Sequence, residues 1–269
     1  TQRKLAEQEL SHTNRALRMS SEGNERLIRA KSEHELLDQI CQVAVDIGGY
    51  RMAWVGYAQD DDFRSIQPMA HAGEENGYFS EIQLSWSEHP VNGRGPAGCT
   101  IRNGTAQICE DMSQETSLIQ SREQARQRGY RGVICLPLRE NNRTFGLLGL
   151  YSADVITADA GEMKQLQKLA DNLAFGIGHL RAESRRQTAD TKVREQAALL
   201  NATTDAIVLK AMDDQILFWN RGAEQIYGWT EAEAIGKKTR ELLSSQFEAY
   251  EDAIRILQQK NHWHGEIKK

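Results

Sequence analysis

One long polar stretch divides this chain of 269 residues into two parts. No glycine or proline occurs between Gly178 and Gly222, and segment 181–196 is rich in arginine, glutamate, glutamine and threonine. Because glycine and proline are the strongest helix breakers, the polar segment 181–196 predicts an unbroken helix. A helix this polar has no apolar face to bury, so it predicts a connector between two folded modules.

The helix that becomes the connector begins with an apolar face. Asp159 followed by Glu162 is typical of a helix N-terminal cap. Apolar residues then recur at three- and four-residue spacing, which indicates a buried face. They are Met163, Leu166, Ala170, Leu173, Ile177 and Leu180.

Residues 1–48 predict two more helices. In 1–30 the heptad positions are only partly apolar, which is typical either of a marginal dimer seam or of a lone solvated helix. Those positions are Ala6, Leu10, Thr13, Leu17, Ser20, Asn24 and Leu27. Segment 31–48 has a continuous apolar stripe, which predicts a helix packed on a core. The stripe comprises Leu36, Leu37, Ile40, Cys41, Val43, Ala44 and Ile47.

Between the helices, strands come in pairs joined by short polar turns. In the first part we expect strands at 50–57, 64–72, 105–109, 132–138 and 144–151, with a helix at 117–128. In the second part we expect strands at 206–212 and 216–220, short helices at 221–227, 230–235 and 238–243, a helix at 246–260 and a strand at 262–269. Hairpin pairing predicts an α/β fold of the α+β type: two modules, each an antiparallel sheet flanked by helices, joined by a connector helix.

Composition excludes several classes of function. The net charge of −5 shows no basic excess for nucleic acid. No apolar run approaches the ~18 residues of a membrane span, so we expect no direct membrane contact. The four cysteines form no C-x-x-C pair and have no histidines at zinc spacing, so we predict no metal site and a reducing, cytoplasmic compartment. We also expect the chain to be part of a longer protein, whose anchoring upstream of Thr1 the sequence does not show.

The first part resembles a GAF domain over residues 27–182. The motifs that carry the resemblance are GYRMAWVGY at 49–57, GRGPAG at 93–98, RNG at 102–104, LPL at 136–138 and GLLGLY at 146–151. The resemblance implies one antiparallel sheet with helices on one face and loops on the other that can enclose a small ligand.

The second part resembles the first two-thirds of a PAS domain. The motifs are LNATTDAI at 200–207, ILFWN at 216–220, AEQIYGW at 223–229 and HWHGE at 262–266. The last strands of such a domain are absent from the sequence. We therefore divide the chain into an N-terminal signalling helix (1–30), a GAF domain (31–182), a helical linker (183–200) and an incomplete PAS domain (201–269).

A GAF domain followed by a PAS domain is the layout of bacterial sensor proteins. The resemblance implies a sensory and signal-relay region, with a sensor histidine kinase as the first expectation and a diguanylate cyclase or phosphodiesterase as the alternative. The catalytic domain would follow in the same chain. We find no ATP-binding loop and no nucleophile with a base and orienting group at recognisable spacing, so we predict no catalytic residue and no enzyme activity within 1–269.

Aromatic and polar residues on the strands and loops of the first part predict a small-molecule pocket, and the equally weighted alternative is that they fill a core. The candidates are Trp54, Tyr57, His71, Tyr78, Trp86, Arg102 and Cys109. In the second part we expect a packed core, with pocket residues as the alternative, and Asn220 as the cap of the helix after it. The core candidates are Ile207, Leu209, Phe218, Ile226, Tyr227, Leu242 and Phe247.

The sequence requires no cofactor. A functional alternative to the ligand-binding relay module is a redox or haem sensor, in which the first part of the chain carries the chemistry. Cys41 and Cys135 lie in apolar patterns typical of core cysteines, whereas Cys99 and Cys109 adjoin glycine-rich loop. Neither of these is followed by the histidine of bilin-binding domains. A single histidine suffices for haem, and His71 and His89 are the candidates.

The last expectation concerns assembly. We predict a parallel homodimer through helices 1–30 and 159–200, because Leu10, Leu17, Leu27 and Leu180 need a partner surface. The alternative is that helix 1–30 folds back antiparallel on helix 159–190 of its own chain.

Overall fold

A computed structural model describes residues 2–88, 93–114, 121–157 and 159–242, together with 255, 256, 259, 260 and 262, and it describes side chains from Leu10 onward. The chain forms two compact units, Thr1–Ser184 and Arg185–Lys269. The helix expected at 246–260, the strand expected at 262–269, and the residues Phe247 and His89 fall wholly or largely outside the described part.

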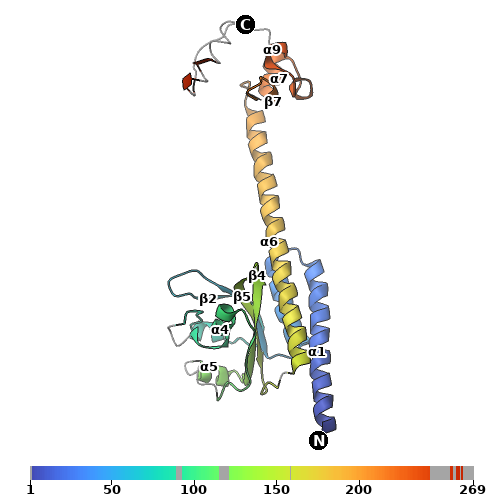
Figure 1. Ribbon diagram of the computed structural model, residues 1–269, viewed down its shortest axis with the longest axis vertical. Coiled ribbons are helices and arrows are strands. Elements are labelled where there is room, and N and C mark those ends of the chain that lie inside the picture. The colour runs from blue at the N-terminus through green and yellow to red at the C-terminus, as the bar shows by residue number, and fades with distance from the viewer. Residues whose placement is uncertain are drawn as a thin grey trace. The chain divides into compact units, whose positions relative to one another are not determined.

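Unit 1 is built on one five-stranded sheet (Figure 1). The strands lie in the order β2-β1-β5-β4-β3 and every neighbouring pair is antiparallel. The predicted mixture of helices and antiparallel sheet is confirmed. The strands are β1 (Met52–Ala58), β2 (Ile66–Gly73), β3 (Gln107–Cys109), β4 (Gly132–Glu140) and β5 (Arg143–Ser152).

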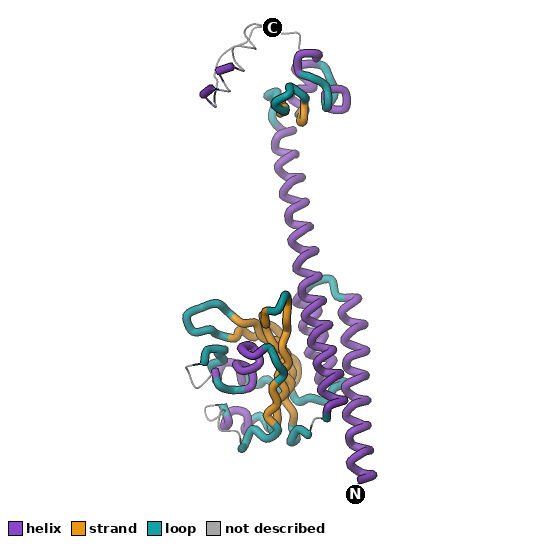
Figure 2. The backbone as a smooth tube through the Cα atoms, viewed as in Figure 1, coloured by secondary structure: helices purple, strands orange, loops and turns teal. Residues whose placement is uncertain are grey.

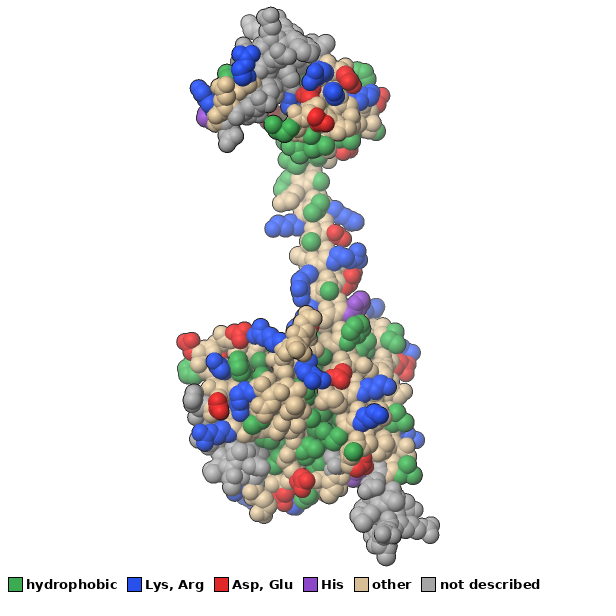
Figure 3. All heavy atoms as spheres, viewed as in Figure 1, with side chains coloured by type: hydrophobic (Ala, Val, Ile, Leu, Met, Phe, Trp, Pro, Cys, Tyr) green, Lys and Arg blue, Asp and Glu red, His purple; other side chains and the backbone are tan. Residues whose placement is uncertain are grey.

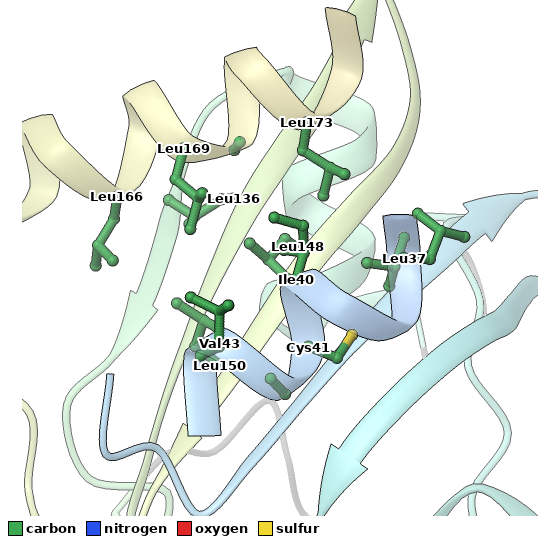
Figure 4. Packing of buried hydrophobic residues seen from close by; sticks show 14 of the residues in the cluster. Leu37, Ile40, Cys41, Val43, Leu136, Leu148, Leu150, Leu166, Leu169 and Leu173 are labelled. Carbon is green, nitrogen blue, oxygen red and sulfur yellow. The ribbon is translucent and has the colours of Figure 1, made fainter. Parts of the chain in front are cut away.

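Three long helices cover one face of this sheet, which we call the helix face (Figure 2). They are α1 (Gln2–Arg29), α2 (Glu33–Asp46) and the first half of α6 (Ala160–Ala202). Their apolar stripes meet side chains from β1, β4 and β5 in a buried core, as Figure 4 shows for Ile40, Leu148 and Leu169. Ser32 caps α2 by accepting the amide N–H of Glu35 at 3.3 Å.

Helix α1 packs parallel to α6 within one chain. The Arg15 guanidinium binds Glu162 at 3.3 Å, and Asn172 donates to Asn24 at 2.6 Å, so residue numbers rise together along both helices (Figure 1). The expected packing of helix 1–30 on helix 159–190 of its own chain is therefore confirmed, but the expected antiparallel direction is wrong. An apolar stripe reads the same in both directions, so spacing alone could not fix the direction of packing.

The opposite face of the sheet, which we call the loop face, carries loops and three short helices. These are α3 (Tyr78–Glu81), α4 (Pro96–Asn103) and α5 (Arg122–Gln127). A second buried cluster fills the space beneath them. Its members include Met52, Trp54, Tyr78, Cys109, Tyr130, Cys135, Leu147 and Tyr151.

Unit 2 has a two-stranded antiparallel sheet and three short helices in its described part. They are β6 (Val208–Lys210), β7 (Ile216–Trp219), α7 (Arg221–Tyr227), α8 (Glu231–Ala234) and α9 (Thr239–Leu242). The small core comprises Ile216, Trp219, Ala223 and Ala234. Asn220 caps α7 by accepting the Ala223 amide N–H at 2.9 Å, which confirms the capping role predicted for it.

Candidate functional site

The loop face brings together most of the residues predicted to line a pocket. Trp54, Tyr78 and Cys109 are buried in its cluster, and Trp86 packs against them. The Tyr78 ring contacts Tyr130 edge-on, with the ring centroids 5.3 Å apart. These residues therefore form one aromatic layer over the sheet.

Tyr57 does not belong to this group. It lies three residues after Trp54 on β1, and side chains alternate between the two faces of a strand. Tyr57 therefore lies on the helix face, where its hydroxyl donates to Glu33 at 2.6 Å. Its place is in the core under the helices.

One register row crosses the sheet beneath the aromatic layer. His71 on β2 pairs with Trp54 on β1, Trp54 pairs with Gly149 on β5, and Gly149 pairs with Cys135 on β4. His71 is exposed at the edge of the row, and its ring lies 6.1 Å from that of Phe79. The row thus places an imidazole, an indole and a thiol on one face.

Arg102 lies on α4 and donates hydrogen bonds to other residues of the loop face. Its guanidinium donates to the carbonyl oxygens of Trp86 at 3.0 Å and Gly93 at 2.6 Å. The same group donates to the Cys99 sulfur at 3.3 Å. Together with Glu88, Arg94 and Cys99 it lines an open depression of about 490 Å³.

Three of the four cysteines meet on the loop face. Cys109 lies opposite Val133, two residues before Cys135 on β4. Cys99 lies on α4, and the next residue, Thr100, donates to the Cys135 carbonyl oxygen at 3.3 Å. Burial raises the pKa of the Cys135 thiol, and the neighbouring Cys109 and Cys99 raise it further. Sequence reasoning missed this grouping because it depends on strand register.

The cysteines differ in access to solvent. Cys99 is half-buried at the depression, and its sulfur donates to the Arg94 carbonyl oxygen at 3.3 Å. Cys109 and Cys135 are buried. Cys41 lies in the helix-face core instead, where burial raises the pKa of its thiol to about 12.

A charged cluster joins four elements on the helix face, and we call it the Arg181 cluster. Arg181 on α6 makes two hydrogen bonds to the Glu33 carboxylate, at 2.6 and 2.7 Å. Its guanidinium lies 4.8 Å from the Tyr57 ring centre and 5.2 Å from that of Phe145. Burial by itself would raise the pKa of Glu33, but hydrogen bonds from Arg181 and Tyr57 and the charge of Arg181 hold it below its ordinary value.

The predicted residues of unit 2 divide between core and surface. Ile207, Phe218, Tyr227 and Leu242 are half-buried, and Asn220 is fully buried. Leu209 is 58% exposed and Ile226 is 56% exposed, so the prediction that they are core residues is wrong. Val208 lies opposite Trp219 and packs on the core, whereas Leu209 lies opposite Phe218 on the other face of the short sheet.

In the described part of the chain, no group of three or more histidine, cysteine, aspartate or glutamate side chains could hold a metal ion. None of the helices described is both long and apolar enough to cross a lipid bilayer.

Comparison with known families identifies both units. Residues 30–178 match the GAF domain family, and residues 194–268 match the PAS fold. The first match covers more than half of the chain, which therefore belongs to the GAF domain family. The domain pair expected from the sequence is confirmed.

Solved structures share the fold at low sequence identity. The GAF domain of a phosphoenolpyruvate-protein phosphotransferase from Coxiella burnetii is 16% identical with a TM-score of 0.53, covering 64% of this chain and 98% of that one. Free methionine-R-sulfoxide reductase from Neisseria meningitidis, solved with its substrate, is 16% identical with a TM-score of 0.51, covering 61% of this chain and 89% of that one. No curated protein sequence matches the chain significantly.

Proposed function

We propose that this chain is the sensory and signal-relay region of a bacterial signalling protein. A GAF domain and a PAS domain mark it as a sensory or regulatory module. Our first proposal for the output is a histidine kinase, and a diguanylate cyclase or phosphodiesterase is the alternative. In this proposal 1–269 is not catalytic: unit 1 binds a small ligand on its loop face, and a catalytic domain of the same protein receives the signal.

The observation that carries the proposal is α6. Residues 166–177 of this helix are part of the helix-face core of unit 1, and the Leu200 carbonyl near its end accepts a hydrogen bond from Asn220 in unit 2. Between them the helix is exposed and carries charges of both signs (Figure 3). One helix therefore contributes to both domains, and a change in its packing reaches both.

We infer that the relay works in a parallel homodimer. Asn24 and Asn172 form a hydrogen bond where α1 meets α6. On α1, Leu17 lies seven residues before Asn24 and Ile28 lies four residues after it, so all three share one helix face. On α6, Phe175 lies three residues after Asn172. Leu17 is 50% exposed, Ile28 81% and Phe175 74%. These side chains form an apolar face on unit 1 that a second copy would cover. Leu27 and Leu180, which we expected on that face, pack partly on the core of their own chain.

Cysteine crosslinking tests the relay. Val193 is 64% exposed on α6, and in a parallel two-fold dimer Val193→Cys, in a Cys99→Ser background, should form a disulfide between copies. Removing the Arg181 cluster with Arg181→Ala should change the crosslinking rate several-fold. Arg139→Ala is the matched control, since it removes an exposed ion pair to Asp171 of the same helix and should leave the rate unchanged.

Light scattering decides whether the dimer exists. Phe175→Glu should reduce the dimer to a monomer at micromolar concentration. Phe63→Glu adds the same charge at a residue that is 81% exposed in the loop before β2, and it should leave the mass unchanged. A monomeric wild-type mass, or a crosslinking rate indifferent to Arg181→Ala, would contradict the relay proposal.

A second candidate function is favoured by the three cysteines on the loop face. Here unit 1 is a thiol-based redox sensor. A disulfide such as oxidised glutathione would be attacked by the Cys99 thiolate, releasing one glutathione thiol. Cys135 would then displace the second glutathione, so that two protein thiols lose two electrons and form a disulfide.

Thiol counting tests this candidate. After incubation with oxidised glutathione, wild type and Cys41→Ser should each lose two alkylatable thiols, because Cys41 lies on the other face. Cys99→Ser should form no internal disulfide and should therefore lose no alkylatable thiols. The candidate fails if all four wild-type cysteines remain reduced. Turnover of free methionine-R-sulfoxide that is lost in Cys99→Ser would instead make the site catalytic and refute our proposal of a non-catalytic module.

A further inference from the structure

The indole N–H of Trp54 is a buried donor without a protein acceptor. The side chain is fully buried, and among the described residues its Nε1 atom has no hydrogen-bond partner. Two other tryptophans in the described part of the chain do have one. Trp86 donates to the Gln59 carbonyl at 3.0 Å, and Trp219 donates to the Trp229 carbonyl at 2.9 Å.

The place of this donor in the sheet is determined by two glycines. A Cβ atom at Gly149 would lie 2.1 Å from Trp54 Nε1, and one at Gly56 would lie 2.4 Å from the six-membered ring. The indole therefore lies across the backbone of both residues, with its N–H edge over β5. Gly149 pairs with Cys135 on the far side, so the donor lies in the middle of the register row.

The surroundings define what the donor could bind. The Phe79 ring packs against Trp54 with the centroids 4.9 Å apart, and Met52 and Leu147 are part of the same buried cluster. The buried Arg128 already bonds to the carbonyl oxygens of Glu75 and Asn76, and Arg102 bonds to others. Both of these arginines therefore already have acceptors, so neither is available to bind an anion here. An aromatic wall with one hydrogen-bond donor suits a neutral molecule instead.

We propose that Trp54 is the hydrogen-bond donor of the ligand site in unit 1. The ligand class is a compact, uncharged molecule with one acceptor oxygen, such as a ketone or an amide. Its oxygen accepts the Trp54 N–H, and its apolar part lies against Phe79. This inference rests on the proposed sensory function and names the ligand class and the residue that selects it.

Binding to this donor can be observed directly by NMR. The indole N–H resonances of the full chain are recorded during titration with cyclopentanone, and with cyclopentane as the matched probe that lacks the acceptor. The resonance lost in Trp54→Phe should move saturably with cyclopentanone and stay in place with cyclopentane. The resonance lost in Trp86→Phe should move with neither, since its N–H is bonded to Gln59.

Three outcomes would overturn the proposal. One is a Trp54 resonance that does not respond to cyclopentanone, and another is an equal response to both probes. The third is saturable binding that moves only resonances away from the loop face. Where Trp54→Phe does not fold, contacts to Phe79 protons assign the Trp54 resonance in wild type. If crosslinking at Val193 still depends on Arg181 while Trp54 is silent, the ligand site is wrong and the relay stands.

Discussion

Replacing Asn220 with alanine is expected to lower the free energy of unfolding of unit 2 by about 4 kcal/mol. Asn220 is fully buried, and its Oδ1 atom accepts the amide N–H groups of Ile207 at 2.7 Å and Ala223 at 2.9 Å. Its Nδ2 atom donates to the carbonyl oxygens of Leu200 at 2.8 Å and Asp205 at 2.9 Å. Alanine would leave four backbone groups without this partner, and an unsatisfied buried group costs about 1–3 kcal/mol.

Hydrogen exchange of the β6 and β7 amides measures this effect within unit 2 alone. Asn201→Ala is the matched control. The Asn201 side chain is exposed and accepts one hydrogen bond, from the Arg221 amide N–H at 3.0 Å, so its loss should cost well under half as much. Equal loss of protection in the two variants would show that Asn220 acts only as a helix cap.

Local patterns predicted the elements of this chain well. The apolar stripe of 31–48 became α2 because its period matches one helix face, and the polar turn at 140–143 joins β4 and β5. The lack of glycine or proline after Gly178 correctly predicted the continuity of α6. Asn220 could be assigned as a cap because its residue type and its place before a helix are sufficient evidence.

Faces and distances could not be predicted in the same way. The alternation of β1 places Tyr57 and Trp54 on opposite faces, but it does not show which of the two faces the helices cover. Ile207, Val208 and Leu209 are all apolar, so the sequence pattern does not show which of them faces the core, and the prediction places Leu209 where the structure has Val208. The meeting of Cys99, Cys109 and Cys135 depends on register between segments far apart in the sequence.

The Arg181 cluster is the second feature with a large expected effect. Its four residues come from α2, β1, β5 and α6, and sequence reasoning identified only Tyr57 among them. Arg181→Ala removes two charge-assisted hydrogen bonds and both ring contacts. It leaves the Glu33 carboxylate half-buried, with Tyr57 as its one remaining side-chain donor among the described residues. A fully buried pair would lose about 3–5 kcal/mol, and because solvent reaches both groups we expect about 2 kcal/mol for unit 1.

Glu33→Gln should remove the part of this stabilisation that depends on the carboxylate charge and therefore on pH. The folded pKa of Glu33 is held below its ordinary value of 4.5 by Arg181 and Tyr57, against the opposing effect of burial. A lowered folded pKa means that the ionised carboxylate stabilises the fold, fully above pH 4.5 and progressively less as the pH falls through the folded pKa. Wild type should therefore be more stable than Glu33→Gln at pH 7, and urea denaturation should show this advantage shrinking below pH 4.5. A difference that stays constant from pH 7 to pH 3 would mean that Glu33 contributes by packing and not by charge.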